Sequence, residues 1–101
     1  MRRGTTPTFS FEVDADLTGW DVYITFEQGS RTVTRRSPEI EQTEGGCTCS
    51  VELTQAETLL FKPKRAQAQL RAVKDGTAVA STIFDFDVGD VLLGGEIPQE
   101  V

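Results

Sequence analysis

The chain of 101 residues contains no histidine and no asparagine. Without histidine, Ser-His-Asp and Cys-His nucleophilic schemes cannot be built within this chain, and the commonest transition-metal ligand is missing. Without asparagine there is no acceptor for N-glycosylation. No apolar run approaches the roughly 20 residues that span a bilayer. The opening "MRRGTTPTF" carries two arginines without an apolar stretch behind them, which is not the pattern of a secretory signal.

Positive charge is also scarce. Ten Lys and Arg residues face sixteen Asp and Glu residues, so the net charge is −6. This balance opposes non-specific binding to nucleic acid and to anionic lipid, so we expect neither as a partner. The basic residues nevertheless form two local clusters, which are either phosphate contacts or solvated edges that meet an acidic neighbour. The clusters are Arg31, Arg35 and Arg36, and Lys62, Lys64 and Arg65.

Only two cysteines occur, one residue apart, in the stretch "GGCTCSVEL". In strand register, Cys47 and Cys49 continue the apolar row of Val51 and Leu53. Neighbours two apart on one strand face lie roughly 6.5–7 Å apart, whereas a disulfide needs Cβ atoms roughly 3.5–4.5 Å apart. A structural zinc site needs four ligands. We therefore predict two buried, reduced thiols, with an intermolecular disulfide or zinc site as the alternative.

Most of the chain alternates apolar and polar residues, with turn signals roughly every 8–12 residues, as in a β-sandwich or barrel. The stretch "TFSFEV" alternates in this way. So does "WDVYITFE", which places Trp20 inside as the buried tryptophan of the sandwich and Tyr23 outside. The polar stretch "RTVTRR" is typical of an edge strand, because arginines discourage pairing between edges. The stretch "EIEQT" predicts a further short strand.

The second half of the chain mixes signals. Thr54 and Glu57 have capping-box spacing ahead of an apolar run, which predicts one helical turn near 55–61. Residues 66–74 fit a helix or a strand, but the hairpin signal Asp75-Gly76 that follows favours the strand. A break in the apolar register around 79–84 predicts a bulge. We expect an all-β fold, an antiparallel β-sandwich of about seven strands over 1–88, with 89–101 as a C-terminal arm or cap.

Two acidic groups were considered as sites. Asp14, Asp16 and Thr18 match the start of a calcium loop, but the twelfth position is Thr25 instead of the bidentate glutamate. The alternative is an Asp-rich turn between strands. Asp85 and Asp87 share one strand face, as an acid–base pair or as its solvent side. Glycine-rich phosphate loops do not occur in the sequence. We expect no enzymatic activity and no cofactor.

Four stretches carry a family resemblance: "MRRGTTPTFSFEV", "LTGWDVYITFEQG", "VELTQAETLLF" and "DGTAVASTIFDFDVGDVLLGGEI". They resemble small prophage-encoded proteins from the structural-gene regions of tailed phages of Firmicutes and gut bacteria. They are similar to the immunoglobulin-like N-terminal domain of phage baseplate upper proteins, which ties receptor-binding parts to the tail. The resemblance covers nearly the whole chain and depends on hairpin and core patterns.

The resemblance implies an immunoglobulin-like sandwich in a non-enzymatic virion structural or assembly protein of the tail, baseplate or neck. Such a protein is made in the bacterial cytoplasm and enters the virion if it is assembled. Its partners would be other phage structural proteins or further copies of itself. The alternative is a carbohydrate- or ligand-binding module, with Tyr23 as a stacking ring or with an occupied calcium loop. The candidate contact residues are Arg31, Arg35, Arg36, Tyr23, Lys62, Lys64, Val91, Leu92 and Leu93.

Overall fold

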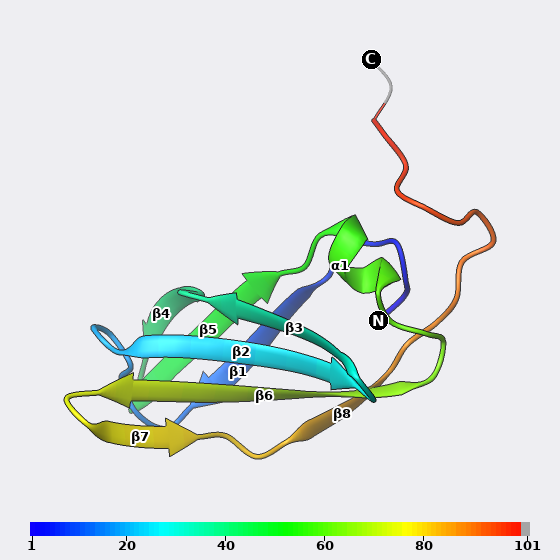
Figure 1. Ribbon diagram of the computed structural model, residues 1–101. Coiled ribbons are helices and arrows are strands. Elements are labelled where there is room, and N and C mark those ends of the chain that lie inside the picture. The colour runs from blue at the N-terminus through cyan, green and yellow to red at the C-terminus, as the bar shows by residue number, and fades with distance from the viewer. Residues whose placement is uncertain (100–101) are drawn as a thin grey trace.

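The computed structural model describes residues 1–99, which form two packed β-sheets with one short helix at one end (Figure 1). The elements are β1 (Thr8–Val13), β2 (Asp21–Gln28), β3 (Arg31–Arg36), β4 (Glu39–Thr43), β5 (Gly46–Glu52), α1 (Gln55–Leu59), β6 (Arg65–Lys74), β7 (Thr77–Ala80) and β8 (Phe84–Asp87). The structure therefore confirms the expected all-β fold, the strand over 66–74 and the helical turn that follows Thr54.

The two sheets have the strand order of an immunoglobulin sandwich. One sheet is β1-β5-β4, and the other is β3-β2-β6 with both β7 and β8 paired to β6; all neighbours are antiparallel. These orders correspond to B-E-D and C′-C-F-G, and α1 lies on the crossing from E to F. Within residues 1–99 no strand occupies the position of strand A, beside β1.

Alternating side chains from both sheets fill the core, as the sequence pattern predicts. Phe26 from one sheet meets Phe9 from the other at 4.9 Å between ring centroids. Cys47 and Cys49 are both buried and free, with their Sγ atoms 3.9 Å apart. Burial raises the pKa of Cys49 to about 12, so its thiol stays protonated. The two cysteines are thus core residues, as predicted.

The expectation of a buried tryptophan was wrong. Trp20 is only partly buried, and it precedes β2 instead of starting it. Its backbone N–H donates to the carbonyl of Leu17 at 3.0 Å, which closes a tight turn. This turn directs the Leu17 side chain into the core, where it is completely buried, and leaves the indole at the rim. Leu17 lies in an Asp-rich turn, so the alternating pattern does not reveal it.

The predicted bulge is present and splits the last strand in two. Arg71 pairs with Ala80, whereas Ala68 pairs with Phe84, so the three residues 81–83 lie opposite two residues of β6. Ser81 holds the bulge, because its backbone N–H donates to the Leu70 carbonyl at 2.8 Å and its hydroxyl accepts from the Leu70 N–H at 3.0 Å. This split gives eight strands where about seven were expected.

The chain leaves the sandwich beside its own N-terminus. Val88 is buried and donates its N–H to the Lys64 carbonyl, and Gly89 exchanges backbone hydrogen bonds with Met1 and Arg3. Residues 92–99 then run outward with exposed side chains, past the end of α1 (Figure 1). Residues 100–101, the end of the predicted arm, lie outside the described residues.

Candidate partner-binding surface

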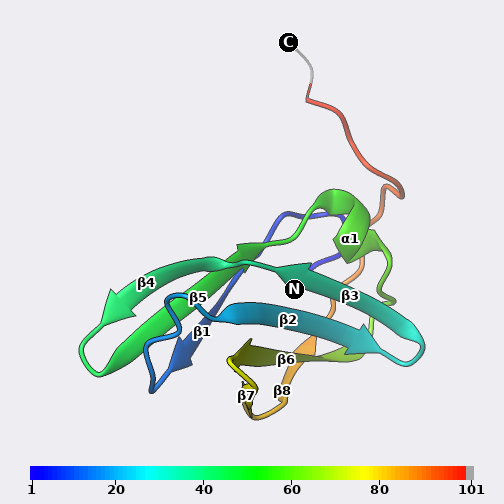
Figure 2. The same ribbon diagram turned by 60° about the vertical axis from the view of Figure 1, so that its left-hand side comes forward.

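Strands β3 and β4 form one long edge of the sandwich. The chain passes from β3 through Ser37 and Pro38 directly into β4, and the two strands follow one another along one side of the molecule (Figure 2). Within residues 1–99, β3 pairs only with β2 and β4 pairs only with β5, so each strand has one free side. We call residues 31–44, which include the turn residue Glu44, the long edge. Free strand sides of this kind are ready contacts for another chain.

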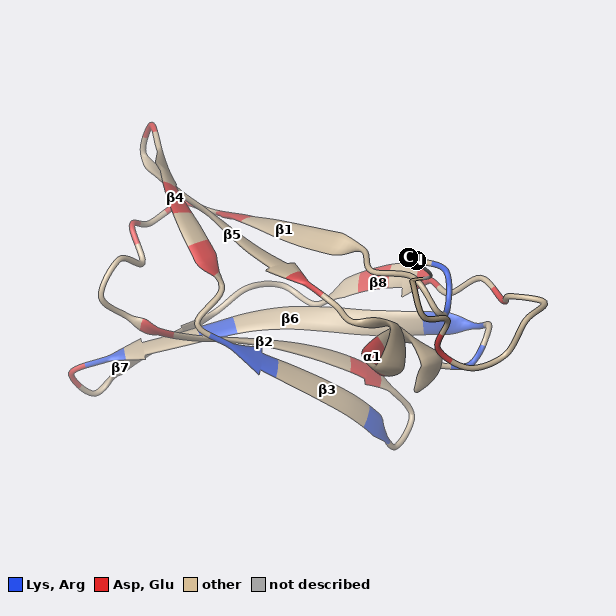
Figure 3. Ribbon diagram, turned by 90° about the horizontal axis from the view of Figure 1, so that it is seen from above, with Lys and Arg blue, Asp and Glu red and all other residues tan. Residues whose placement is uncertain are grey.

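The long edge is divided by charge at its midpoint. Its first half, residues 31–36, contains three arginines and no acid, whereas its second half, residues 39–44, contains three glutamates and no base. In the ribbon of Figure 3, the coloured segments of β3 are basic and those of β4 and the turn after it are acidic. Within residues 1–99, five of these six charged residues form no ion pair. They are Arg31, Arg36, Glu39, Glu41 and Glu44.

Arg35, a predicted contact residue, is used inside the molecule. Its side chain points between the sheets, because it lies opposite the buried Ile24. Its Nη1 lies 2.7 Å from Oε1 of Glu57 and donates to the Glu52 carbonyl at 2.9 Å. The same Glu57 carboxylate accepts the backbone N–H of Thr54 at 2.8 Å and so completes the predicted capping box. Arg35 therefore fastens β3 to α1.

Tyr23 lies between two arginines on the outer face of the larger sheet. Arg36 on β3 and Arg71 on β6 are its direct cross-strand neighbours. The guanidinium carbon of Arg36 stands 5.0 Å from the centre of the tyrosine ring, within range of a cation–π contact. Beside the ring is a shallow hollow of about 290 Å³ that also contacts Thr34 and Ala78. Arg71 was missed from the sequence, because only the strand register brings it beside Tyr23.

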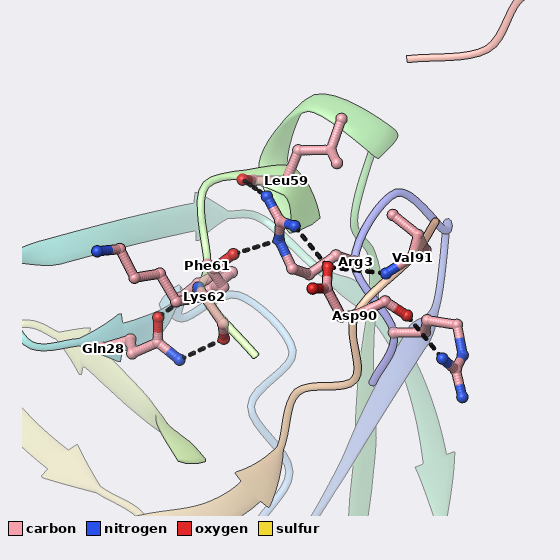
Figure 4. Close-up of polar contacts among 8 residues, drawn as sticks. Arg3, Gln28, Leu59, Phe61, Lys62, Asp90 and Val91 are labelled. Atoms are coloured by element: carbon pink, nitrogen blue, oxygen red, sulfur yellow. Dashed lines mark hydrogen bonds and ion pairs between the residues drawn. The ribbon is translucent and has the colours of Figure 1, made fainter. Parts of the chain in front are cut away.

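The buried side-chain amide of Gln28 holds the backbone of the basic loop at 62–65. Gln28 at the end of β2 donates to the carbonyls of Lys62 and Lys64, at 2.9 and 3.1 Å (Figure 4). Its Oε1 accepts the N–H of Lys62 at 2.6 Å. The Lys62 and Lys64 side chains are exposed. The two lysines therefore extend from a fixed backbone, at the opposite end of β2 from Tyr23.

The start of the C-terminal arm is fixed by the N-terminus. Arg3 lies 2.8 Å from the carboxylate of Asp90 and donates to the carbonyls of Leu59 and Phe61 (Figure 4). The backbone N–H of Val91, and then Arg3, lower the pKa of Asp90. Val91 is partly buried against this junction. The other two predicted arm contacts, Leu92 and Leu93, are exposed.

The Asp-rich turn uses its carboxylate internally. Oδ1 of Asp16 accepts hydrogen bonds from the N–H and the hydroxyl of Thr18, at 2.9 and 2.7 Å, and Oδ2 accepts from Gln42 at 3.0 Å. The Thr18 hydroxyl is the main cause of a lowered pKa at Asp16. Asp14 is exposed. In the part of the chain that the structure describes, no group of three His, Cys, Asp or Glu residues is placed to hold a metal ion.

Asp85 and Asp87 lie on the outward face of β8, where both are exposed. Asp85 accepts a hydrogen bond from Gln67 at 3.2 Å, and Asp87 lies 3.4 Å from Arg65. On the opposite, inward face, Phe84 and Phe86 border an open groove of about 540 Å³ between β1 and β8. This groove lies where strand A of an immunoglobulin sandwich would close the fold. Asp85 also borders this groove, whereas Asp87 does not.

A scan against protein-family models and a search of curated proteins both find no match for this chain. No helix within residues 1–99 is long and apolar enough to cross a membrane. The function of the chain is therefore inferred from the contact surfaces described above.

Proposed function

We propose that this chain is a non-enzymatic interaction module, and that it serves as a structural or assembly protein of a tailed phage, in the tail, baseplate or neck. The observation that carries the interaction role is the long edge, residues 31–44. It presents free strand sides together with charges that form no ion pair within residues 1–99. The assignment to a phage particle depends on the family resemblance of the sequence.

The arrangement of reactive groups also supports a non-enzymatic role. The only thiols of the chain are buried, and burial raises the pKa of Cys49, so it is a poor nucleophile. The carboxylates Asp85 and Asp87 are both exposed, and only Asp85 borders the open groove between β1 and β8. A pair of catalytic carboxylates has to reach the same substrate within one site.

The phage role is tested on particles from the bacterium that carries the gene. After prophage induction, particles are purified on a density gradient and their proteins are quantified by mass spectrometry. We expect the chain in intact particles, or in tail assembly intermediates, in a constant ratio to known tail proteins. Its absence from both fractions, while it is present in the cell lysate, would contradict the phage role.

The alternative function, a carbohydrate- or ligand-binding module, is favoured by one observation: Tyr23 is partly exposed between Arg36 and Arg71. Aromatic rings next to guanidinium groups suit acidic sugars, because the ring stacks while the cations pair with carboxylate. If this function holds, Tyr23→Ala abolishes a signal that the wild-type protein gives on a glycan array. An array without a wild-type signal would end this alternative.

A further inference from the structure

We propose that two copies of this chain associate edge to edge, with the basic half of each long edge facing the acidic half of the other. The proposal names a partner for the long edge and therefore depends on the proposed interaction role. The partner is a second copy of the chain, and the symmetry is a two-fold axis that crosses the edge near Ser37 and Pro38. In such an interface each surface meets the same surface of the other copy.

The order of charges along the long edge indicates that the partner is a second copy of the chain. A two-fold axis that crosses a strand reverses its direction in the partner, so residues before Ser37 meet residues after Pro38. Arg36 then faces Glu39 of the other copy, and Arg31 faces Glu44. Because the two halves have opposite charge, every such contact is attractive, and each occurs twice.

The charges that this interface needs are free to form it. The side chains of Arg36, Glu39, Glu41 and Glu44 are exposed, and Arg31 is partly exposed. The remaining arginine of the edge, Arg35, already pairs with Glu57 and is not needed. Two molecules of net charge −6 repel each other at long range, and a basic segment that faces an acidic one offsets part of this repulsion.

The local shape also favours contact through side chains at this place. Ser37 has a φ of 52° and Pro38 lacks an N–H, so a continuous backbone ladder is interrupted at the proposed axis. A hollow of about 300 Å³ lies at the same point, bordered by Arg36, Pro38 and Glu39. Long charged side chains from a second copy can enter this hollow without displacing the backbone.

The test is the solution mass by light scattering, at millimolar protein concentration and low ionic strength. We expect wild-type protein to approach twice the monomer mass, with a dissociation constant that rises at least tenfold in high salt, because salt screens exposed charges. The double variant R31E/R36E and the double variant E39R/E44R should each weaken association at least tenfold, because the Arg36–Glu39 and Arg31–Glu44 contacts then join like charges.

Two further samples make the test specific. An equal mixture of the two double variants should form heterodimers, and the quadruple variant R31E/R36E/E39R/E44R should dimerise again. The matched control is K62E/K64E, since two reversals of −2 each change its net charge from −6 to −10, the same as R31E/R36E. This control should dimerise almost as well as the wild type.

Three results would overturn the proposal. One is a wild type that stays monomeric under these conditions. Another is a dimer that R31E/R36E weakens no more than K62E/K64E does. The third is a mixture of the two double variants that remains monomeric although circular dichroism shows both to be folded. None of these would affect the particle experiment, so failure of self-association and failure of the phage role can be told apart.

Discussion

Gln28 shows how one residue fixes a loop far away in the sequence. It is only 3% exposed, and its amide makes hydrogen bonds to both Lys62 and Lys64. A buried amide needs hydrogen-bond partners, and this one finds them in the backbone of the loop. A single side chain therefore joins the basic loop to the end of β2, while the Val88 N–H contacts the same loop at Lys64.

Replacing this amide tests that role. We expect Gln28→Met to lower the free energy of unfolding by about 1–3 kcal/mol, because the Lys62 N–H loses its acceptor and the Lys62 and Lys64 carbonyls each lose one donor. The measurement is urea unfolding followed by circular dichroism. The matched control is Gln67→Met, at an exposed glutamine with one hydrogen bond to Asp85, and it should change stability by less than about 0.5 kcal/mol. Equal losses in both variants would contradict the assignment.

The raised pKa of Cys49 predicts that the folded protein loses stability at alkaline pH. Burial raises the pKa of its thiol from 9.0 to about 12, so the folded state keeps the proton longer than the unfolded state does. Stability is thus fully present below about pH 9 and falls as the pH rises from about 9 towards 12, by up to about 1.4 kcal/mol per pH unit for one thiol. Unfolding curves recorded across this range should show the decline.

The control for this decline is Cys49→Ala, which removes the titrating group while tyrosine and lysine still titrate. The variant should lose stability less steeply than the wild type above pH 9. The thiol should also resist iodoacetamide in the folded protein and react after unfolding. Rapid alkylation of the folded protein at pH 8 would show that Cys49 is not buried.

At the scale of elements, the start of β5 depends on close contact between two backbones. A Cβ atom added to Gly46 would lie 2.0 Å from the carbonyl oxygen of Val13, at the end of β1. Because that obstacle is backbone, it cannot move aside as a flexible side chain would. Only glycine lets β1, β5 and the turn from β4 meet at this point.

We expect Gly46→Ala to lower the free energy of unfolding by at least about 1–3 kcal/mol, as overpacking does in a tightly packed core. Gly94→Ala is the matched control, since a Cβ there meets nothing within 4 Å and its effect should stay below about 0.5 kcal/mol. Thermal or urea unfolding compares the two. A stable Gly46→Ala protein would mean that the β1–β5 pair ends before Val13.

At the scale of the whole molecule, two leucines of the arm lie outside the core. Leu93 is 70% exposed and Leu92 is fully exposed, so neither contributes burial to the folded chain. The double variant L92S/L93S should therefore keep its unfolding free energy within about 0.5 kcal/mol of the wild type. The control Leu53→Ala, at a completely buried leucine, should lose about 2–5 kcal/mol.

The same arm variant separates two routes to association. If the long edge alone carries self-association, the mass of L92S/L93S in light scattering equals that of the wild type. If L92S/L93S is folded but monomeric, the interface lies on the arm and at the end of the molecule near α1 instead.

Local sequence patterns are sufficient to predict the individual strands and turns. Alternation of apolar and polar residues is enough to predict strands, because the side-chain period of two decides which residues are buried. The capping box at Thr54, the hairpin at Asp75-Gly76 and the bulge before Phe84 are likewise local signals, and all three are confirmed. The burial of the two cysteines likewise follows from their place in an apolar row.

Contacts between residues far apart in the sequence became visible only in the tertiary structure. It brought Arg71 beside Tyr23, turned Arg35 inward to Glu57, and placed Leu17 in the core where Trp20 was expected. It also set β3 and β4 end to end along one free side. The physical reason is that strand register and sheet packing depend on contacts between residues far apart in the chain, and no local pattern encodes these contacts.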